Sequence, residues 1–341
     1  MGALDIPHSV RENMRILVCG ATGFIGAHLA ESLIEDGNEV VGVDIQPPRY
    51  GIVPRGEIVE ADLRDPDVME SLLRDGFDEV YQLAADMGGA GYLFTGENDA
   101  AVMHNSVTIN LNVLKAASAA PKTPRVFFSS SACIYPQRNQ LDPGNPNCAE
   151  DSAYPADPDS EYGWEKLFSE RLYDTFSRNC GLTVRIARYH NIFGPHCAWN
   201  CGREKAPAAL SRKVAEADDG GEIEIWGDGE QTRSFLHIDE CVEGTKRLMR
   251  SDFAGPVNIG SEEAVTINGL ADMLIGISGK KLTKRNRPGP EGVRGRCSDN
   301  RLIREKLGWA PSQPMVESLP ELYAWIERQV ATTAETAREP V

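Results

Sequence analysis

The sequence has no long apolar run. Its 341 residues contain no stretch that approaches the roughly 20 apolar residues that a helix needs to cross a bilayer. Residues 1–13 lack the basic start and apolar run of a secretory signal, and the chain ends in Arg-Glu-Pro-Val rather than in a prenylation motif. We therefore expect a soluble, cytoplasmic protein with no membrane partner.

Basic residues are scarce in this chain. It has 35 Lys and Arg against 51 Asp and Glu, which gives a formal net charge of −16. Because this charge repels a polyanion, we expect no nucleic-acid partner. The eight cysteines are scattered between residues 19 and 297, which argues against a disulfide framework and for reduced thiols.

What the sequence does have is an alternating pattern of strands and helices. Apolar residues make up 41% and charged residues 25%, a composition typical of folded globular proteins. The alternation predicts an α/β fold, a Rossmann-type doubly wound parallel sheet with a smaller C-terminal substrate-binding lobe. The predicted strands are 15–19, 39–44, 57–63, 79–85, 125–130 and 182–188, and the predicted helices include 24–36, 66–74, 98–119 and 160–179.

The alternation breaks after about residue 190, where Pro, Gly and charged residues separate shorter elements. This break predicts a Rossmann domain at 14–190, to which later segments can return, and a substrate-binding lobe at 191–330. Residues 1–13 and 331–341 lack apolar periodicity and are predicted to be flexible tails.

A glycine-rich turn follows the first predicted strand. It contains Gly20, Gly23, Phe24, Ile25 and Gly26, and it opens the first predicted helix. Small residues here let the backbone approach a pyrophosphate at the helix N-terminus, as in dinucleotide-binding proteins. The alternative is that the glycines only permit tight packing.

Two carboxylates follow the next two predicted strands. Asp44 lies 18 residues after Gly26, where it can accept hydrogen bonds from ribose hydroxyls and repel a 2′-phosphate. Asp62 is expected to reach the adenine edge. A lone Asp at such a position can instead cap a turn. Together with the glycine turn, these residues favour NAD over NADP as the cofactor.

Tyr162 and Lys166 are four residues apart, so a helix that starts at residue 160 places them on one face. A neighbouring cation lowers the pKa of a tyrosine, and the pair can then take a proton from a sugar hydroxyl while hydride leaves for nicotinamide. Ser131, just beyond the fifth predicted strand, would hold the same hydroxyl. Chance Tyr-x-x-x-Lys spacings are common on surface helices, but here the glycine turn and the serines at 129–131 favour a redox site.

With these residues in place, residues 14–330 resemble the extended short-chain dehydrogenase/reductase superfamily, particularly its nucleotide-sugar epimerases and dehydratases. Further marks of the resemblance are the segments 191–195, 226–235 and 257–260. The resemblance implies a bound NAD, which Tyr162 and Lys166 also contact, and a nucleotide-sugar substrate.

The residue two past Ser131 separates the subfamilies. Here it is Cys133, where a 4-epimerase usually has Thr and a 4,6-dehydratase has Thr-Asp-Glu. A thiol can be tuned to lose its proton near neutral pH, and it can then abstract a hydrogen made acidic by an adjacent ketone. Because buried cysteines are often inert, the interpretation depends on the position of Cys133 in the motif.

Four segments, 87–89, 131–136, 202–209 and 289–296, resemble the GDP-mannose 3,5-epimerases. This resemblance implies that Cys133 and Lys205 are the acid/base pair on opposite faces of the sugar ring, acting on a transient 4-keto sugar. It also implies a set of substrate-binding residues, namely Gly91, Ser131, Ala132, Asn191, Glu204, Lys205, Lys213, Gln231 and Arg294. The sequence departs from the pattern at Cys201, where the family has Gly, and around 90–96, which leaves the hexose open.

Charge and helix length suggest two partners. The run 280–296 has seven Lys and Arg against the single acid Glu291, and it is expected to bind the anionic diphosphate of a GDP-hexose. The resemblance to the superfamily implies a homodimer in which the predicted helices 98–119 and 160–179 form a four-helix bundle, and the length of these helices exceeds what one buried face needs.

Other functions stay open at this point. One alternative is a nucleotide-sugar 4-epimerase or 4,6-dehydratase that acts on a UDP or dTDP sugar, and another is a non-catalytic NAD(H)-sensing regulator on the same fold. His190, His196, Cys197 and Cys201 could suggest zinc, but they lack a second ligand pair, so we expect no metal.

Overall fold

A seven-stranded parallel sheet forms the centre of the molecule. The computed structural model describes residues 13–49 and 52–336, and in it the strand order is β10-β6-β5-β4-β1-β2-β3 with every neighbouring pair parallel. The predicted doubly wound parallel sheet is therefore confirmed. The strands are β1 (Arg15–Cys19), β2 (Glu39–Asp44), β3 (Glu57–Glu60), β4 (Glu79–Gln82), β5 (Arg125–Ser131), β6 (Val184–Tyr189) and β10 (Val257–Ile259).

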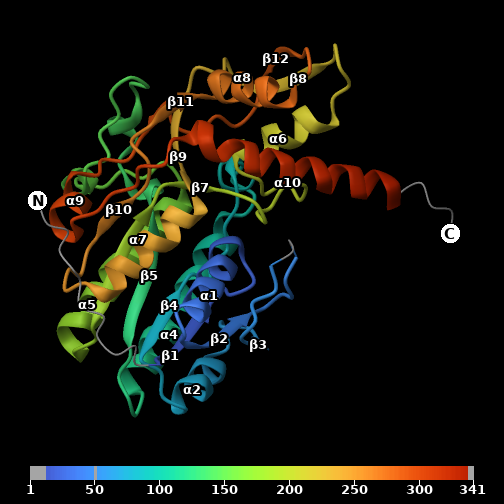
Figure 1. The fold of residues 1–341 in the computed structure, drawn as a ribbon. Helices are drawn as coiled ribbons and strands as arrows, with labels where there is room; N and C mark the ends of the chain where they lie inside the picture. Colours follow the sequence, from blue (N-terminus) through green and yellow to red (C-terminus); the bar gives the residue numbers. More distant parts are fainter. Residues whose placement is uncertain (1–12, 50–51, 337–341) are drawn as a thin grey trace, which may run out of the picture.

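Helices cover both faces of this sheet (Figure 1). Successive side chains of a strand point to opposite faces, and in β1 Ile16 and Val18 belong to one buried cluster while Leu17 and Cys19 belong to another. This is why the strand sequences are apolar throughout rather than alternating. The first cluster packs under α1 (Phe24–Glu35) and α7 (Ile238–Arg250), and the second packs under α2 (Pro66–Arg74), α4 (Asp99–Ala119) and α5 (Glu161–Cys180).

A smaller lobe has its own apolar core. It is built from α6 (Ala206–Glu216), α8 (Ile267–Ser278) and α10 (Met315–Thr336), which pack together with the inner faces of β8 (Glu222–Trp226) and β9 (Thr232–His237). These elements form the upper part of Figure 1. The remaining elements are α3 (Ala90–Leu93), β7 (Asn191–Phe193), β11 (Ala264–Thr266), β12 (Thr283–Arg287), β13 (Gly295–Arg296) and α9 (Arg301–Leu307), together with short 3₁₀ turns between β5 and α5.

Two segments beyond residue 190 lie against the central sheet. Strand β10 pairs with β6, and α7 packs on the same face as α1. The division of the chain at residue 190 itself stays a prediction. At the C-terminus α10 extends to Thr336, into the segment predicted as a tail, and the Thr332 and Thr333 side chains donate hydrogen bonds to the carbonyls of Arg328 and Gln329. The rest of the predicted tails, 1–12 and 337–341, lies outside the described residues.

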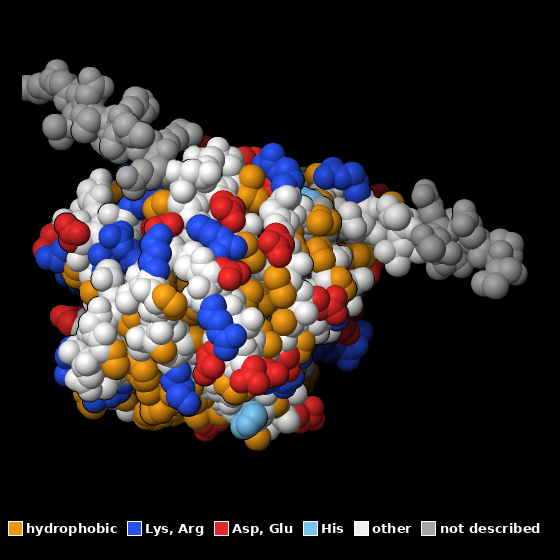
Figure 2. All heavy atoms as spheres, turned by 90° about the horizontal axis from the view of Figure 1, so that it is seen from below, with side chains coloured by type: hydrophobic (Ala, Val, Ile, Leu, Met, Phe, Trp, Pro, Cys, Tyr) orange, Lys and Arg blue, Asp and Glu red, His pale blue; other side chains and the backbone are white. Residues whose placement is uncertain are grey.

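The surface carries charges of both signs. Figure 2 shows Lys and Arg side chains interspersed with Asp and Glu on one face, with hydrophobic side chains gathered toward its lower left. Within the described part of the chain, no helix combines the length and the apolar character that a membrane span requires.

Candidate active site

One cavity of about 690 Å³ runs from the glycine turn to the start of α6. Its walls come from the carboxyl ends of the central strands, where ligands of open α/β sheets bind. All nine predicted cofactor residues and the predicted catalytic residues other than Cys133 line it, namely Gly20, Gly23, Phe24, Ile25, Gly26, Asp44, Asp62, Ser131, Tyr162, Lys166 and Lys205.

The glycine turn leaves no room for side chains. Gly20 has a φ of +80°, and a Cβ there would lie 2.9 Å from the backbone nitrogen of Ala84. A Cβ on Gly26 would lie 2.0 Å from the carbonyl oxygen of Gly20. The turn is therefore pressed between α1 and the end of β4, and the N-terminus of α1 faces the cavity, where its amides can receive an anion.

Asp44 and Asp62 stand at the ends of β2 and β3. Asp44 accepts hydrogen bonds from the backbone amides of Thr22 (3.1 Å) and Gln46 (3.2 Å), which fixes its carboxylate beside the glycine turn. The Arg64 guanidinium holds Asp62 at 2.6 Å and lowers the pKa of that carboxyl, chiefly through its hydrogen bonds. Both carboxylates line the cavity, as the sequence predicts.

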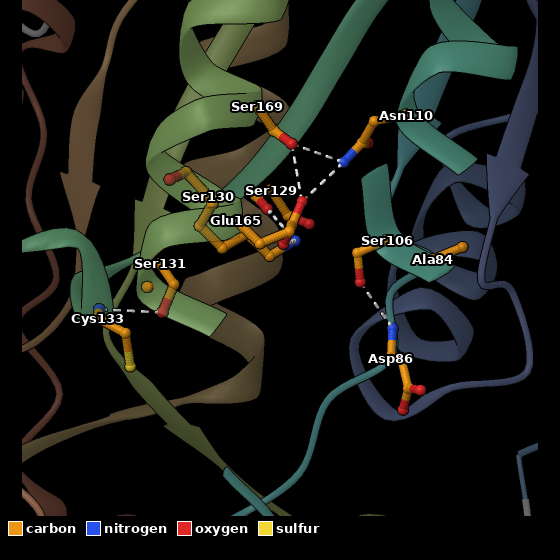
Figure 3. A network of polar contacts seen from close by, with 12 residues as sticks. Ala84, Asp86, Ser106, Asn110, Ser129, Ser130, Ser131, Cys133, Glu165 and Ser169 are labelled. Atoms are coloured by element: carbon orange, nitrogen blue, oxygen red, sulfur yellow. Dashed lines mark hydrogen bonds and ion pairs between the residues drawn. The ribbon is translucent and has the colours of Figure 1, made fainter. Parts of the chain in front are cut away.

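Gly163 allows α5 to approach the end of β5. A Cβ on Gly163 would lie 2.2 Å from the carbonyl oxygen of Cys133. The Ser160 side chain caps the helix by accepting a hydrogen bond from the Gly163 amide (3.3 Å). On the other side of the contact, Ser131 Oγ accepts a hydrogen bond from the Cys133 amide (3.2 Å; Figure 3). The close approach brings Tyr162 next to Ser131 and Cys133.

The expected lowering of the Tyr162 pKa is wrong for the protein without ligands. Burial raises the pKa of Tyr162 well above its ordinary value, the charges of Cys133 and Glu165 raise it further, and a hydrogen bond with Ser131 acts in the opposite direction. The Lys166 ammonium lies 5.6 Å from the centre of the Tyr162 ring, but it is directed elsewhere. It donates to the Ser129 carbonyl (3.1 Å) and pairs with Glu165 at 3.9 Å.

Glu165, Ser169 and Asn110 form a buried polar network (Figure 3), and Glu165 is the ion-pair partner of Lys166. Glu165 is fully buried, and its Oε1 accepts hydrogen bonds from Ser169 (2.7 Å) and Asn110 (3.1 Å). Its Oε2 has no hydrogen-bond partner among the residues that the structure describes, and it faces the Lys166 ammonium. Burial lowers the pKa of Lys166, and the Glu165 carboxylate opposes that shift. The sequence analysis missed Glu165, although it lies inside the Tyr162–Lys166 motif.

Arg296 occupies the other side of Cys133. Its guanidinium donates to Cys133 Sγ (3.1 Å), to Asp159 (2.7 Å) and to Gln140 (2.6 Å). The sequence analysis assigned Arg296 to a diphosphate-binding run, whereas its contacts are with the thiol and with Asp159. Its place in the 289–296 motif was the only signal of a special role.

Lys205 lies at the start of α6 and lines the cavity. Burial lowers the pKa of its ammonium, the charge of Cys133 partly offsets this, and Arg296 lowers it further. Segments 87–89 and 202–209 contact each other next to Lys205. Gly89 donates to the Arg203 carbonyl (3.0 Å), and a Cβ on Gly89 would lie 2.1 Å from the Glu204 carbonyl oxygen.

A charged cluster ties the same loops together at the cavity wall. Asp86 accepts a hydrogen bond from the Tyr92 hydroxyl (2.8 Å) and pairs with Arg203 (3.3 Å). The Arg203 guanidinium also lies 3.9 Å from the centre of the Tyr92 ring. The 90–96 segment, which departs from the family pattern, is thus fixed against the loop that precedes Lys205.

Three predicted substrate-binding residues converge on Trp226, whose side chain is 40% exposed. Gln231 donates to the Trp226 carbonyl (3.1 Å), and the Lys213 ammonium lies 5.6 Å from the centre of the indole. A Cβ on Gly91 would lie 3.4 Å from the same ring. Trp226 itself was noted in a family motif but given no role.

Each of the other predicted substrate-binding residues contacts a different part of the chain. Asn191 donates to the Ser234 carbonyl (3.2 Å), and Glu204 accepts from the Gly202 amide (2.8 Å). Arg294 holds Asp228 with two hydrogen bonds (3.0 and 3.1 Å). Ala132 is buried in the 3₁₀ turn that follows Ser131.

The contacts of the basic run 280–287 do not support its predicted role with a diphosphate. Strand β12 pairs in parallel with β8, and this pairing sets basic side chains opposite acidic ones. Arg285 pairs with Glu222 and Arg287 with Glu224. Lys280 donates to three carbonyls at the C-terminal end of α6, and Lys284 pairs with Asp272.

No cluster suited to a metal ion is found among the described residues. His190 hydrogen-bonds Asn258 (3.2 Å), and burial lowers the pKa of its imidazole to about 3. All eight cysteines are free thiols.

A family model describes most of this architecture. The model of the NAD dependent epimerase/dehydratase family matches residues 16–260. The chain belongs to this family. Within the family, GDP-mannose 3,5-epimerase of Arabidopsis thaliana is 46% identical over 94% of this chain and 84% of the plant protein. The predicted resemblance to GDP-mannose 3,5-epimerases is therefore confirmed.

Two other family members are more distant. UDP-glucuronic acid decarboxylase 5 of Arabidopsis thaliana is 30% identical over 91% of this chain and 88% of that protein. The solved structure of UDP-glucuronic acid 4-epimerase from Bacillus cereus, in complex with UDP-glucuronic acid and NAD, superposes with a TM-score of 0.78 at 27% identity. This match covers 93% of this chain and 100% of the other.

NAD is the cofactor of the family, and the residues of this chain fit it. The crowded glycine turn at the start of α1 leaves backbone amides to face a pyrophosphate. Asp44 is anchored by two backbone amides, and its carboxylate lines the cavity where ribose hydroxyls would lie.

Proposed function

We propose that the chain epimerises GDP-mannose at C3 and C5. The observation that carries the proposal is the meeting of four reactive groups at one site. The Cys133 side chain packs against the cluster that contains Tyr162, and Tyr162, Lys166 and Lys205 line the same cavity, so a thiol, a phenol and two ammonium groups lie close together. A reaction confined to C4 has no use for the thiol and the second lysine.

The oxidation step uses the residues at the start of α5. Tyr162, as the phenolate, accepts the proton of the C4 hydroxyl, Ser131 holds the same oxygen, and Lys166 supplies positive charge that favours the phenolate. When bound, NAD would supply the acceptor for the C4 hydride and, once reduced, the donor that returns this hydride to C4 after the inversion.

The inversion step uses the residues around the thiol. A ketone at C4 makes the hydrogens at C3 and C5 acidic. Cys133, as the thiolate, takes the proton from one face of the carbon, and Lys205, as the ammonium, gives a proton to the other face. Because its pKa is lowered, the Lys205 ammonium is a stronger acid than that of an exposed lysine and donates its proton more readily.

Nucleotide recognition is assigned to the residues around Trp226. Its half-exposed indole offers a flat apolar face, and Lys213, Gln231 and Gly91 surround it. Arg294 lies nearby in the same lobe and can exchange Asp228 for a phosphate, because a guanidinium binds both bidentately. GDP is proposed as the nucleotide, from the plant relative's name.

We also propose that the enzyme is a cytoplasmic homodimer. On α5, Trp164 and Phe168 lie one helical turn apart and are 41% and 48% exposed, so they form an apolar surface. Helix α4 packs beside α5, and the two together can supply half of a four-helix bundle. The eight free thiols suit a reducing compartment.

The proposal is tested by incubating the purified chain with GDP-mannose and following the sugar by NMR. We expect sugars inverted at C5, or at C3 and C5, to form without added NAD. UDP-glucose and dTDP-glucose, the substrates that the alternative 4-epimerase or 4,6-dehydratase would use, serve as controls and should be unchanged. Inversion at C4 of a UDP sugar, with GDP-mannose untouched, would contradict the proposal, and binding of NAD(H) with no turnover of any sugar would favour the regulator.

A further inference from the structure

We propose that Arg296 holds Cys133 as a thiolate aimed at the sugar, and is therefore a further catalytic residue of the inversion step. This inference rests on the proposed function, because it assumes that Cys133 is the base at the carbon next to the ketone. The coupling between the guanidinium and the sulfur, however, can be measured without any substrate.

The geometry leaves the guanidinium a single orientation. Arg296 is only 5% exposed, and each of its three nitrogens has a different partner. Nε donates to Gln140 Oε1 (2.6 Å), Nη2 to Asp159 Oδ2 (2.7 Å) and Nη1 to Cys133 Sγ (3.1 Å). The first two contacts therefore direct the third at the sulfur.

The backbone beneath Arg296 is also fixed. Strand β13 pairs with β9, and a Cβ on the preceding Gly295 would lie 2.7 Å from the Cα of Pro143. The close packing of Gly295 sets the position of the strand, and the strand sets the reach of the Arg296 side chain. This explains why a Gly-Arg pair ends the 289–296 motif.

Four cations lie around Cys133, namely Arg296 on β13, Arg233 on β9, Lys205 at the start of α6 and Lys166 on α5. Tyr162 also faces it, and the carboxylates of Asp159 and Glu165 lie behind Arg296 and Lys166. A guanidinium keeps its proton at every working pH, whereas the lysines titrate, so Arg296 is a permanent cation, and its Nη1 donates a hydrogen bond to the sulfur.

A thiolate is the form that removes a proton from carbon. The hydrogen bond from Nη1 stabilises the charge before the proton is taken and weakens when the sulfur becomes a thiol. Arg296 gives up no proton itself. The proton taken from the carbon ends on Cys133 Sγ, and Lys205 delivers a different proton to the opposite face.

The test measures the alkylation of Cys133 by iodoacetamide over a range of pH, followed by mass spectrometry of the Cys133 peptide so that the other seven cysteines do not interfere. In Arg296→Gln we expect the rate at neutral pH to fall about tenfold and its midpoint to move to higher pH. Arg296→Lys keeps the positive charge but loses the planar guanidinium, so its alkylation rate should lie between those of the wild type and Arg296→Gln. An unchanged rate and midpoint in Arg296→Gln would overturn the proposal.

Two further variants separate this role from a merely structural one. Arg188 is another buried arginine, paired with Glu170 at 2.8 Å, so Arg188→Gln should lose similar stability while Cys133 alkylation stays as in the wild type. Asp159→Asn removes the negative charge that shares the guanidinium but keeps a side-chain oxygen acceptor that orients it, so it should speed alkylation, in the direction opposite to Arg296→Gln. Unchanged or slower alkylation in Asp159→Asn would overturn the proposal. Asp159→Asn also keeps the test decisive if Arg296→Gln does not fold.

A second measurement separates this inference from the proposed function. In D₂O with GDP-mannose, Arg296→Gln should incorporate deuterium from solvent about tenfold more slowly than the wild type, while still forming NADH. Slower alkylation with wild-type deuterium incorporation would show that the pair exists but that Cys133 is not the base. In that case the proposed function of Cys133 is wrong, and with it the catalytic role of Arg296.

Discussion

Gly163 and Cys133 are in contact without any side chain between them. A Cβ on Gly163 would lie 2.2 Å from the Cys133 carbonyl oxygen, so only a glycine lets α5 reach the end of β5. Since Tyr162 precedes this glycine and Ser131 lies two residues before the cysteine, this one contact positions the groups assigned to both the oxidation and the inversion.

The contact makes Gly163 sensitive to the smallest substitution. Gly163→Ala should lower the free energy of unfolding by about 1–3 kcal/mol, because the added methyl group must push helix and strand apart. Chemical denaturation measures this. Gly276 is the matched control: it lies in α8 with open space around its Cα, so Gly276→Ala should be neutral or stabilising by about 0.5–1 kcal/mol. Equal effects of the two substitutions would contradict the role given to the contact.

The central sheet could be predicted from the sequence because the signals for its strands are local. The apolar strands and the glycine turn each depend on a few neighbouring residues, and the observed helix α2 (Pro66–Arg74) matches the predicted 66–74. No such signal marks the end of α10, because residues 331–336 carry no apolar periodicity, yet the helix continues to Thr336.

The candidate site was harder to predict where long-range pairing decides the outcome. Arg285 and Arg287 read as free charges until β12 pairs with β8 and places Glu222 and Glu224 opposite them. Arg296 lies far from Cys133 in sequence, so no spacing rule connects them. The pKa of Tyr162 was misjudged because the depth of burial outweighs a cation at 5.6 Å.

Tyr162→Phe tests the oxidation step. The substitution removes the hydroxyl that accepts the C4 proton and keeps the ring, so kcat should fall by roughly 10² to 10⁴. NAD and GDP-mannose should still bind, but no absorbance of reduced nicotinamide should appear on adding the sugar. Near-normal epimerisation in this variant would show that another group takes the C4 proton.

The pH profile tests Lys205. Its ammonium is the form that donates a proton, and the protonated fraction falls as pH rises through the pKa. Since burial lowers the pKa of Lys205, inversion at C3 and C5 should decline at a pH below the ordinary lysine range. Oxidation at C4 does not use Lys205 and serves as the internal control. If the rate of C4 oxidation falls over the same pH range as the inversion, a group other than Lys205 is titrating.

Sedimentation tests the dimer. The wild-type chain should sediment at twice the mass of one chain at micromolar concentration, and a Trp164→Glu/Phe168→Glu variant at the mass of a single chain. Leu141 is 62% exposed but lies away from α5, so Leu141→Glu is the control that should leave the dimer intact. A wild-type monomer would refute the assignment of α4 and α5.

The exchange of sugar hydrogens with D₂O tests the central claim most directly. Wild-type enzyme with GDP-mannose should place solvent deuterium at C3 and C5 of the inverted products. Cys133→Ser should still oxidise C4, since Tyr162, Lys166 and the NAD site are untouched, while deuterium incorporation falls by roughly 10² to 10⁴. Lys205→Ala should instead admit deuterium with the original configuration retained. Undiminished double inversion in Cys133→Ser would contradict a 3,5-epimerase that uses this thiol as its base.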